Sequence, residues 1–267
     1  RTFNNHFATR SLNEDGTWKD LTKQRNSTAD ISPTAGQMPR LLGLAWASKL
    51  FRDNKELSKY NKFSNSGNEV AFGTIGDAST SEGHFWETIN AAAVMQVPMA
   101  LAVWDDGYGI SVPREYQTTK GSISELLKGF EKGDKDSTGI ILYKVKGWDY
   151  AGMIAAFSEG VERARKEHVP VVFHVTEITQ PQGHSTSGSH ERYKSAERLE
   201  WEKEFDCNRR FHDWIVKEKI ATEQELAQTE QKAIDDAKIA RDKAWDAFTS
   251  PVKKERDELI KIIDNRS

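Results

Sequence analysis

The sequence predicts an α/β fold: a doubly wound, mostly parallel sheet with helices on both faces and a helical C-terminal extension. The first observation is a pair of apolar runs, residues 70–75 and 99–104, on either side of a helix-forming segment, 85–95. Apolar strands joined through a helix are typical of parallel strands that are covered on both faces.

The second observation is that the same order of elements returns later in the chain. A strand is predicted at 139–145, a helix at 153–167 and another strand at 169–175. Repeated β-α-β units favour a doubly wound parallel sheet. We therefore expect an α/β domain at 1–195, whose N-terminal part is missing, and a helical extension at 196–267.

The remaining elements follow from local signals. Residues 1–30 are polar and predict loop structure, with a hairpin turn at 13–16. Pro39 suits the first turn of a helix, and the apolar residues that follow it up to residue 51 predict a helix buried by its neighbours. Residues 123–130 predict a short amphipathic helix.

The C-terminal extension is rich in Glu, Lys, Arg and Ala. Thr222 and Glu225 form a capping-box pattern, so a long helix is predicted from Thr222 to Phe248, and Ser250-Pro251 is expected to end it. We expect these helices to pack on the domain or on a partner, because their aromatic residues need burial. A disordered or coiled-coil tail is the alternative.

Composition excludes several classes of protein. The chain has 267 residues and a formal net charge of −3, which gives no strong field toward nucleic acid or membrane. No apolar run approaches the length of a membrane span, and no signal peptide is visible. The single Cys207 rules out an intrachain disulfide and fits a reducing compartment, so we expect a cytoplasmic protein.

Acidic residues follow both strands of the first β-α-β unit. Asp77 comes after the first strand, and Asp105-Asp106 come after the second, each next to a glycine, Gly76 or Gly107. Carboxyl ends of parallel strands share one edge of the sheet, where ligands bind. Oxygen ligands of this kind suit Mg²⁺, which usually keeps phosphate oxygens as further ligands. The alternative is that these acids are only turn and cap residues.

The stretch 72–113 resembles the thiamine diphosphate fingerprint, which begins Gly-Asp-Gly and ends in Asn-Asn. It is most similar to the alpha subunit of the decarboxylating component of 2-oxo acid dehydrogenase complexes. The resemblance gives the metal roles to Asp77, Asp106 and the carbonyl of Tyr108. It also implies cofactor contacts, which fall on Gly76, Asp77, Ala78, Asp106, Tyr108 and Ile110.

Two departures from the fingerprint are visible. Ala78 replaces the third glycine, and Asp105-Asp106 replaces the Asn pair, which adds negative charge next to the metal. The extra charge either strengthens cation binding or repels the diphosphate.

Two loops extend the resemblance. Ser32, Pro33 and Thr34, with Gln37, match a family loop that lines the cofactor and holds K⁺ in branched-chain members; Thr34 replaces a leucine. Residues 183–187 match the family's Gly-His-Ser loop. His184 then corresponds to the histidine that reaches the cofactor and assists transfer to the lipoyl group, so it is the predicted catalytic residue.

The resemblance implies a 2-oxo acid dehydrogenase that uses thiamine diphosphate and Mg²⁺ to decarboxylate its substrate and to acylate a lipoyl group. The implied partners are a beta subunit or a fused beta half and a lipoyl-bearing acyltransferase, in a homodimer of alpha-beta units, that is, a heterotetramer. Ser81-Glu82-Gly83 and the loop at 184–187 favour branched-chain acids. The glutamate that activates the cofactor belongs to the beta partner, so none is assigned here.

Two alternatives remain at this stage. One is another thiamine diphosphate enzyme, such as a transketolase-like protein. The other is a non-catalytic subunit that keeps the fold, which the departures at Ala78 and Asp105-Asp106 favour. Cofactor binding distinguishes the second alternative from the enzymes.

Overall fold

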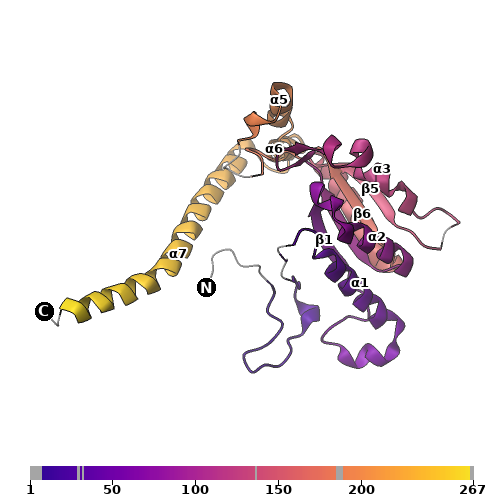
Figure 1. Ribbon diagram of the computed structural model, residues 1–267, viewed down its shortest axis with the longest axis horizontal. Coiled ribbons are helices and arrows are strands. Elements are labelled where there is room, and N and C mark those ends of the chain that lie inside the picture. The colour runs from indigo at the N-terminus through magenta and orange to yellow at the C-terminus, as the bar shows by residue number, and fades with distance from the viewer. Residues whose placement is uncertain (1–7, 29–30, 32, 136, 185–188, 265–267) are drawn as a thin grey trace. The chain divides into compact units, whose positions relative to one another are not determined.

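The computed structural model describes residues 8–28, 31, 33–135, 137–184 and 189–264. The chain divides into two compact units, and the change from one to the other falls between Phe211 and His212. This point lies later in the chain than the division we predict after residue 195. The larger unit holds the sheet and the predicted site (Figure 1).

A parallel four-stranded sheet forms the centre of the larger unit. Its strands are β1 (Ala71–Gly76), β2 (Met99–Trp104), β5 (Ile141–Lys146) and β6 (Val171–Thr176), in the order β1-β2-β6-β5. The register pairs Ile75 with Val103 and Val103 with His174, so the carboxyl ends are level. The predicted α/β fold with a parallel sheet is confirmed.

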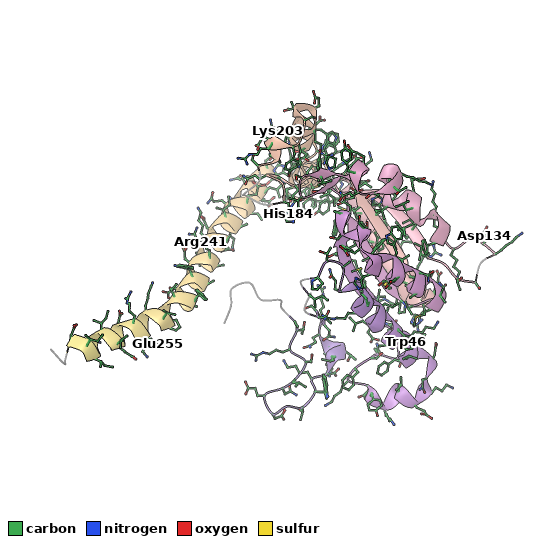
Figure 2. The ribbon with its side chains drawn as sticks, in the orientation of Figure 1. Trp46, Asp134, His184, Lys203, Arg241 and Glu255 are labelled. Atoms are coloured by element: carbon green, nitrogen blue, oxygen red, sulfur yellow. The ribbon has the colours of Figure 1, made fainter. Side chains whose placement is uncertain are left out.

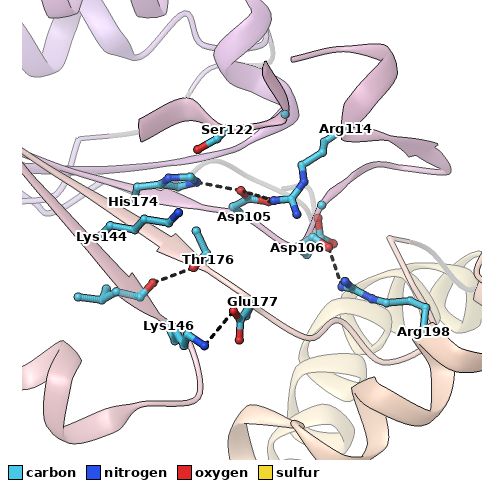
Figure 3. A pocket seen from close by; sticks show the side chains of 13 residues that line it. Asp105, Asp106, Arg114, Ser122, Lys144, Lys146, His174, Thr176, Glu177 and Arg198 are labelled. Atoms are coloured by element: carbon cyan, nitrogen blue, oxygen red, sulfur yellow. Dashed lines mark hydrogen bonds and ion pairs between the residues drawn. The ribbon is translucent and has the colours of Figure 1, made fainter. Parts of the chain in front are cut away.

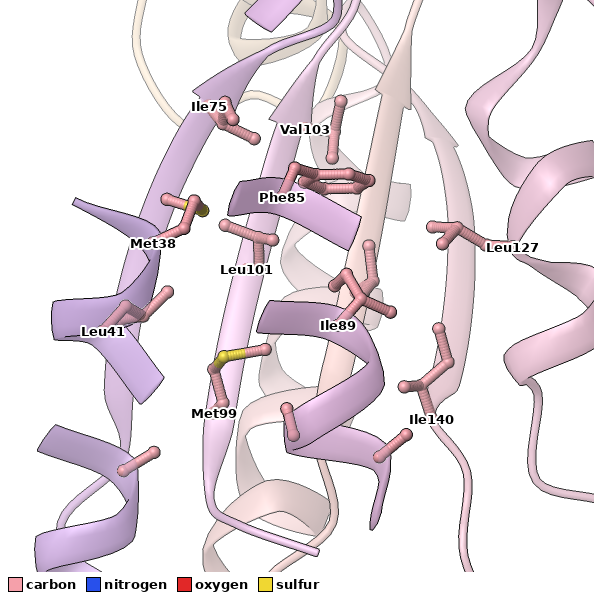
Figure 4. Close-up of a cluster of buried hydrophobic side chains, with 14 of the residues drawn as sticks. Met38, Leu41, Ile75, Phe85, Ile89, Met99, Leu101, Val103, Leu127 and Ile140 are labelled. Carbon is pink, nitrogen blue, oxygen red and sulfur yellow. The ribbon is translucent and has the colours of Figure 1, made fainter. Parts of the chain in front are cut away.

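Helices cover both faces of this sheet. The helices α1 (Met38–Asp53), α2 (Gly83–Met95) and α3 (Ile123–Leu127) contribute to one hydrophobic core, and α4 (Tyr150–Glu167) contributes to the other. In the first core Met38 lies near the carboxyl end of β1, beside Ile75, while Leu41 lies further back (Figure 4). The N-terminus of α1 therefore faces the edge of the sheet that carries the acids.

The core on the α4 side depends on an aromatic stack and a close approach. Phe157 of α4 stacks on Phe173 of β6 with ring centroids 4.0 Å apart. A Cβ atom at Gly160 would lie 2.6 Å from the Phe173 ring, so only glycine lets α4 pack this closely.

The prediction for α1 is only partly right. Met38, Leu41, Ala45 and Ser48 are buried, but Leu44, Trp46 and Leu50 are 41–48% exposed. The sheet and α2 cover one stripe of the helix, and Leu44, Trp46 and Leu50 lie outside this stripe. Apolar composition alone did not reveal which side would be covered.

Short elements connect the main ones. A two-residue hairpin joins β3 (Tyr108–Gly109) to β4 (Val112–Pro113), directly after β2. The turn predicted at 13–16 is confirmed by the bridge between Leu12 and Trp18. The 3-10 helices are Leu21–Lys23, Lys55–Tyr60, Ala78–Ser81, Arg114–Tyr116, Thr119–Gly121, Lys128–Phe130 and His190–Arg192.

Three helices follow the sheet: α5 (Ala196–Glu204), α6 (Cys207–Lys217) and α7 (Glu223–Asp264). The capping box at the start of α7 is confirmed, because the Thr222 N–H donates to Glu225 Oε2 at 2.8 Å and the Glu225 N–H donates to Thr222 Oγ1 at 3.3 Å. Among the described residues, no helix combines the length and apolar character that crossing a membrane requires.

The predicted end of α7 at Ser250-Pro251 is wrong. The helix continues through Pro251 to Asp264, and no residue of α7 is buried (Figure 2). Proline removes one backbone hydrogen bond from a helix interior, but the turns on either side keep theirs. The Ser250 hydroxyl also binds the Asp246 carboxylate one turn earlier, at 2.9 Å.

Candidate functional site

The predicted acids lie together at the carboxyl edge of the sheet because the strand pairing continues into them. The Asp77 N–H donates to the Trp104 carbonyl at 3.0 Å, and the Asp105 N–H donates to the Val175 carbonyl at 2.9 Å. These hydrogen bonds hold the first residues after β1 and β2 in fixed positions. Side chains from separate parts of the sequence are thus brought to one edge.

Asp77 carries the clearest sign of a missing partner. Its side chain is buried, and its Oδ2 atom has no hydrogen-bond partner among the described residues. Burial and the nearby charges of Asp105 and Asp106 raise the pKa of Asp77 to about 7. A cation at this position would satisfy the oxygen and favour the ionised carboxylate.

The Asp105 carboxylate, unlike that of Asp77, already has hydrogen-bond and ion-pair partners in the protein. Its carboxylate accepts a hydrogen bond from His174 Nε2 at 2.8 Å and pairs with Arg114 at 3.1 Å (Figure 3). Burial would raise the pKa of Asp105, but the hydrogen bond from His174 and the charge of Arg114 outweigh it, so the pKa is lowered. The extra negative charge predicted beside the metal is therefore largely offset by protein groups.

The protonation of His174 follows from its other neighbour. The Ser124 backbone N–H points to His174 Nδ1 at 3.3 Å, and the Ser124 hydroxyl lies 2.5 Å from the same atom. Nδ1 must therefore accept, and the proton of the neutral ring lies on Nε2, where it is donated to Asp105. The sequence pattern does not predict a site role for His174 or Arg114; for His174 the one signal is a histidine inside an otherwise apolar strand.

Asp106 forms the turn that follows. Its Oδ1 atom accepts the Tyr108 N–H at 3.1 Å, and its carbonyl accepts a hydrogen bond from Arg198 at 2.8 Å. Burial raises the pKa of Asp106, although the Tyr108 N–H and the charge of Lys194 act against it. The turn is thus fixed from both its side chain and its backbone.

Helix α5, through Arg198, and Lys194, which precedes the N-cap residue of α5, support this turn. The Tyr108 ring lies beneath two cations, Lys194 at 5.2 Å and Arg198 at 5.5 Å. Both cations bind Glu202, at 2.7 and 2.8 Å. Sequence analysis assigned no site role to this segment, because these contacts join residues that are far apart in the chain.

The loop that carries His184 packs next to Tyr108 through Tyr193. Gly183 packs against Tyr193, since a Cβ atom there would lie 2.1 Å from the tyrosine hydroxyl. Tyr193 in turn contacts the Tyr108 ring, with centroids 5.6 Å apart. His184 itself is exposed. Ser185 and Ser187, which also match the family loop, lie outside the described residues.

The second predicted loop lies at the N-terminus of α1. Pro33 and Thr34 are exposed there, and Ser32 lies outside the described residues. The Oε1 atom of Gln37 is buried without a hydrogen-bond partner in the described structure. A carbonyl oxygen left in this way fits the expected K⁺, although no observation assigns an ion to it.

The departure at Ala78 is accommodated locally. Gly109 lies against Ala78: a Cβ atom at position 109 would be 2.9 Å from the Ala78 methyl group. Gly76 precedes Asp77 at the end of β1, and Ile110 follows at the tip of the β3–β4 hairpin with a φ of 59° and 62% exposure. A β-branched residue at positive φ is strained, which is typical of functional sites.

The predicted ligands are oxygen donors of the kind that Mg²⁺ prefers. No group of three or more His, Cys, Asp or Glu side chains that could hold a metal occurs among the described residues. The predicted set instead has two carboxylates, Asp77 and Asp106, and the carbonyl of Tyr108. Three oxygen donors leave the other coordination positions of the metal open, which suits a cation whose remaining ligands come from a phosphate group.

Comparison with known protein families gives the wider context. The model of the family described as "Dehydrogenase E1 component" matches residues 9–253 of this chain. This chain belongs to the dehydrogenase E1 component family. The matched range includes the sheet, the acidic edge, the His184 loop and most of α7.

Several curated relatives in this family are alpha subunits. The chain is 31% identical, over 68% of its length, to the mitochondrial alpha 2 subunit of 2-oxoisovalerate dehydrogenase from Arabidopsis thaliana, and covers 34% of that protein. It is 28% identical, over 76% of its length, to the alpha subunit of the pyruvate dehydrogenase E1 component from Rickettsia prowazekii, and covers 55% of it. A 2-oxoisovalerate dehydrogenase alpha subunit from Bacillus subtilis is 27% identical over 69% of the chain, which covers 49% of that protein.

These relatives are longer than this chain, and their names give different substrates. The chain spans about a third to just over half of the length of these relatives. They also include proteins named for a branched-chain acid and for pyruvate. The family is therefore shown, whereas the activity and the substrate of this chain are matters for a proposal.

Proposed function

We propose that this chain is the alpha part of a 2-oxo acid dehydrogenase E1 component that uses thiamine diphosphate and Mg²⁺. The observation that supports it most directly is the orphaned carboxylate of Asp77 at the strand edge, close to Asp106, in a chain of this family. A buried carboxylate that lacks a partner is unfavourable unless a ligand completes it.

The residues have separable roles in this proposal. Asp77, Asp106 and the Tyr108 carbonyl hold Mg²⁺, and the metal in turn holds the diphosphate. Thiamine diphosphate, when bound, supplies the carbanion stabilisation that lets a 2-oxo acid lose CO₂. Pro33, Thr34 and Ser32 lie along the cofactor.

The remaining predicted contacts complete the site. Gly76 and Ala78 flank Asp77 and leave room for the diphosphate. Ile110 presents an apolar side chain from a strained backbone. His184 donates a proton during transfer to the lipoyl group, a role suited to a histidine near neutral pH.

Two features argue against a non-catalytic subunit. The departure at Ala78 is matched by Gly109, and the charge of Asp105 is offset by Arg114 and His174. Both departures are thus compensated by neighbours, as expected for a site that has been kept.

The proposal also includes a substrate class and a set of partner subunits. Ser81-Glu82-Gly83 and the His184 loop support a branched-chain 2-oxo acid. A beta subunit or fused beta half and a lipoyl-bearing acyltransferase complete the reaction, in a homodimer of alpha-beta units, a heterotetramer. K⁺ near Gln37 and a cytoplasmic location are parts of the same proposal, and no nucleic acid or membrane takes part.

The test is 2-oxo-acid-dependent reduction of an artificial electron acceptor. The chain is combined with its beta partner, thiamine diphosphate and Mg²⁺, and supplied with pyruvate, 2-oxoglutarate or 3-methyl-2-oxobutanoate. We expect turnover to be greatest with 3-methyl-2-oxobutanoate and to be lost in Asp77→Ala and Asp106→Ala. Asp134→Ala, in an exposed turn, is the control that keeps activity.

A direct cofactor-binding measurement on the same samples separates the alternatives. Cofactor binding without turnover of any of the three acids would favour another thiamine diphosphate enzyme. Absence of both binding and turnover would favour the non-catalytic subunit.

A further inference from the structure

A cavity of about 370 Å³ opens beside the acidic edge, at the carboxyl ends of β2, β6 and β5 (Figure 3). Crevices at this edge of open α/β sheets are where ligands bind. Its volume is at the small end of the range for small-molecule sites. The cations that line it are Arg114, Lys144, Lys146 and Arg198.

The cavity adjoins the proposed metal site and shares Asp106 with it. Asp77 does not line it, and the Asp105 carboxylate lies between, turned toward Arg114 and His174. Lys144 and Lys146 belong to β5, the strand at the opposite edge of the sheet from β1. The cavity therefore opens on the β5–β6 side of the Asp105-Asp106 turn.

Three of the four cations that line the cavity already have a carboxylate partner. Arg114 pairs with Asp105, Lys146 with Glu177, and Arg198 with Glu202, which lies outside the lining. The Lys146–Glu177 pair at 3.1 Å is half exposed, so it is weak and can exchange partners. No hydrogen bond or ion pair joins the Lys144 side chain to another described residue; Glu125, on which its charge acts, is paired with Lys128.

One neutral donor also lacks a partner. The Oγ atom of Ser122 is buried at the wall of the cavity, and no described residue forms a hydrogen bond with it. Ser122 precedes α3 but does not cap it with its side chain. A hydroxyl donor beside an unpaired ammonium group is a suitable set for an anionic oxygen.

We propose that this basic cavity binds a small organic anion that carries a phosphate ester or carboxylate groups. Lys144 supplies the main charge contact, Ser122 donates a hydrogen bond, and Lys146 and Arg114 add charge at the rim. This site is independent of the proposed function, because it needs neither the metal nor the thiamine cofactor.

The test is calorimetric titration of the full chain at constant ionic strength with two probes, ribose 5-phosphate and citrate. We expect one of them to bind at a single site. We expect Lys144→Gln to weaken binding about tenfold, which corresponds to about 1.4 kcal/mol. Ser122→Ala should weaken it less. Lys128→Gln, an exposed lysine after α3 that does not line the cavity, is the matched control.

The outcomes are distinct. Preference for ribose 5-phosphate identifies a phosphate ester, and preference for citrate identifies a carboxylate; either supports the site if Lys144→Gln weakens it. No binding of either probe, or equal weakening by Lys128→Gln, overturns it.

A repeat with saturating Mg²⁺ and thiamine diphosphate tests independence. Unchanged affinity supports a separate site, and one-for-one competition would assign the cavity to the diphosphate and overturn the proposal. Failure of the chain to bind thiamine diphosphate would contradict the proposed function alone.

Discussion

At the scale of single residues, Asp77 is the group with the most unusual environment. It is buried, one of its oxygens lacks a partner, and its pKa is raised to about 7 by burial and by the charges of Asp105 and Asp106. The folded chain thus keeps a proton that the unfolded chain releases near the ordinary value of 3.8. Without a cation, stability must fall as the pH rises between these two values.

This gives a prediction for Asp77→Asn. In EDTA, the free energy of unfolding of the unsubstituted chain should fall between about pH 4.5 and about pH 7, and the fall should be smaller in the variant. The pKa of Asp106 is also raised, so Asp106 adds to the decrease of stability with pH in both proteins. The pKa of Asp105 is lowered, so Asp105 changes the stability only at more acidic pH. Urea unfolding at both pH values measures the difference, and equal slopes would contradict the assignment.

A second prediction concerns His174. Its removal in His174→Ala leaves the buried Asp105 carboxylate without one donor, and the free energy of unfolding should fall by about 1–3 kcal/mol or more. His174→Gln retains a side-chain donor and should recover part of the loss. Urea unfolding is the measurement. His212→Ala, a partly exposed histidine in α6, is the comparison and should change stability little.

At the scale of elements, the β3–β4 hairpin and the turn after β1 fit each other through Ala78 and Gly109. Gly109→Ala should destabilise the chain by about 1–3 kcal/mol through overpacking. Adding Ala78→Gly should recover part of this loss, because it removes one of the two groups that the new Cβ atom meets; the other is the Gln117 side chain, whose Oε1 atom would lie 2.5 Å away. A double-mutant cycle by urea unfolding measures the coupling, and strictly additive effects would show that the two positions do not touch.

Helix α7 offers a further test at this scale. Pro251 lacks the N–H that would complete the helix interior. Pro251→Ala should stabilise the surrounding turns by up to about 3 kcal/mol. Hydrogen exchange of the amides on either side of position 251 should become slower, while exchange near Thr222 should stay the same. Unchanged exchange at both places would mean that the helix is interrupted there in solution.

At the scale of the whole molecule, ligand binding should appear as stability. Mg²⁺ with thiamine diphosphate at about 100 times the dissociation constant should add about 2.7 kcal/mol to the free energy of unfolding. The gain should disappear in Asp106→Ala and remain in Asp134→Ala. Thermal unfolding with and without the ligands measures it. An equal gain in Asp106→Ala would place the cofactor elsewhere.

The sequence by itself determined the type and order of the main elements. The apolar run 99–104 coincides with β2, and the pattern of strands and acids predicts that the acids after β1 and β2 share one edge of the sheet. These predictions succeeded because unbroken apolar runs, turn glycines and the capping pair Thr222 and Glu225 are local signals. Parallel pairing then requires that both strand ends meet.

Only the tertiary structure decided which groups complete the site. His174 reaches Asp105 from another strand, Arg198 reaches the Asp106 carbonyl from α5, and Gly109 accommodates Ala78. No local pattern marks such contacts, because they depend on the register of the sheet and on where a distant helix packs. For the same reason the exposed side of α1 and the passage of α7 through Pro251 could not be predicted: burial and helix continuation depend on neighbours in space.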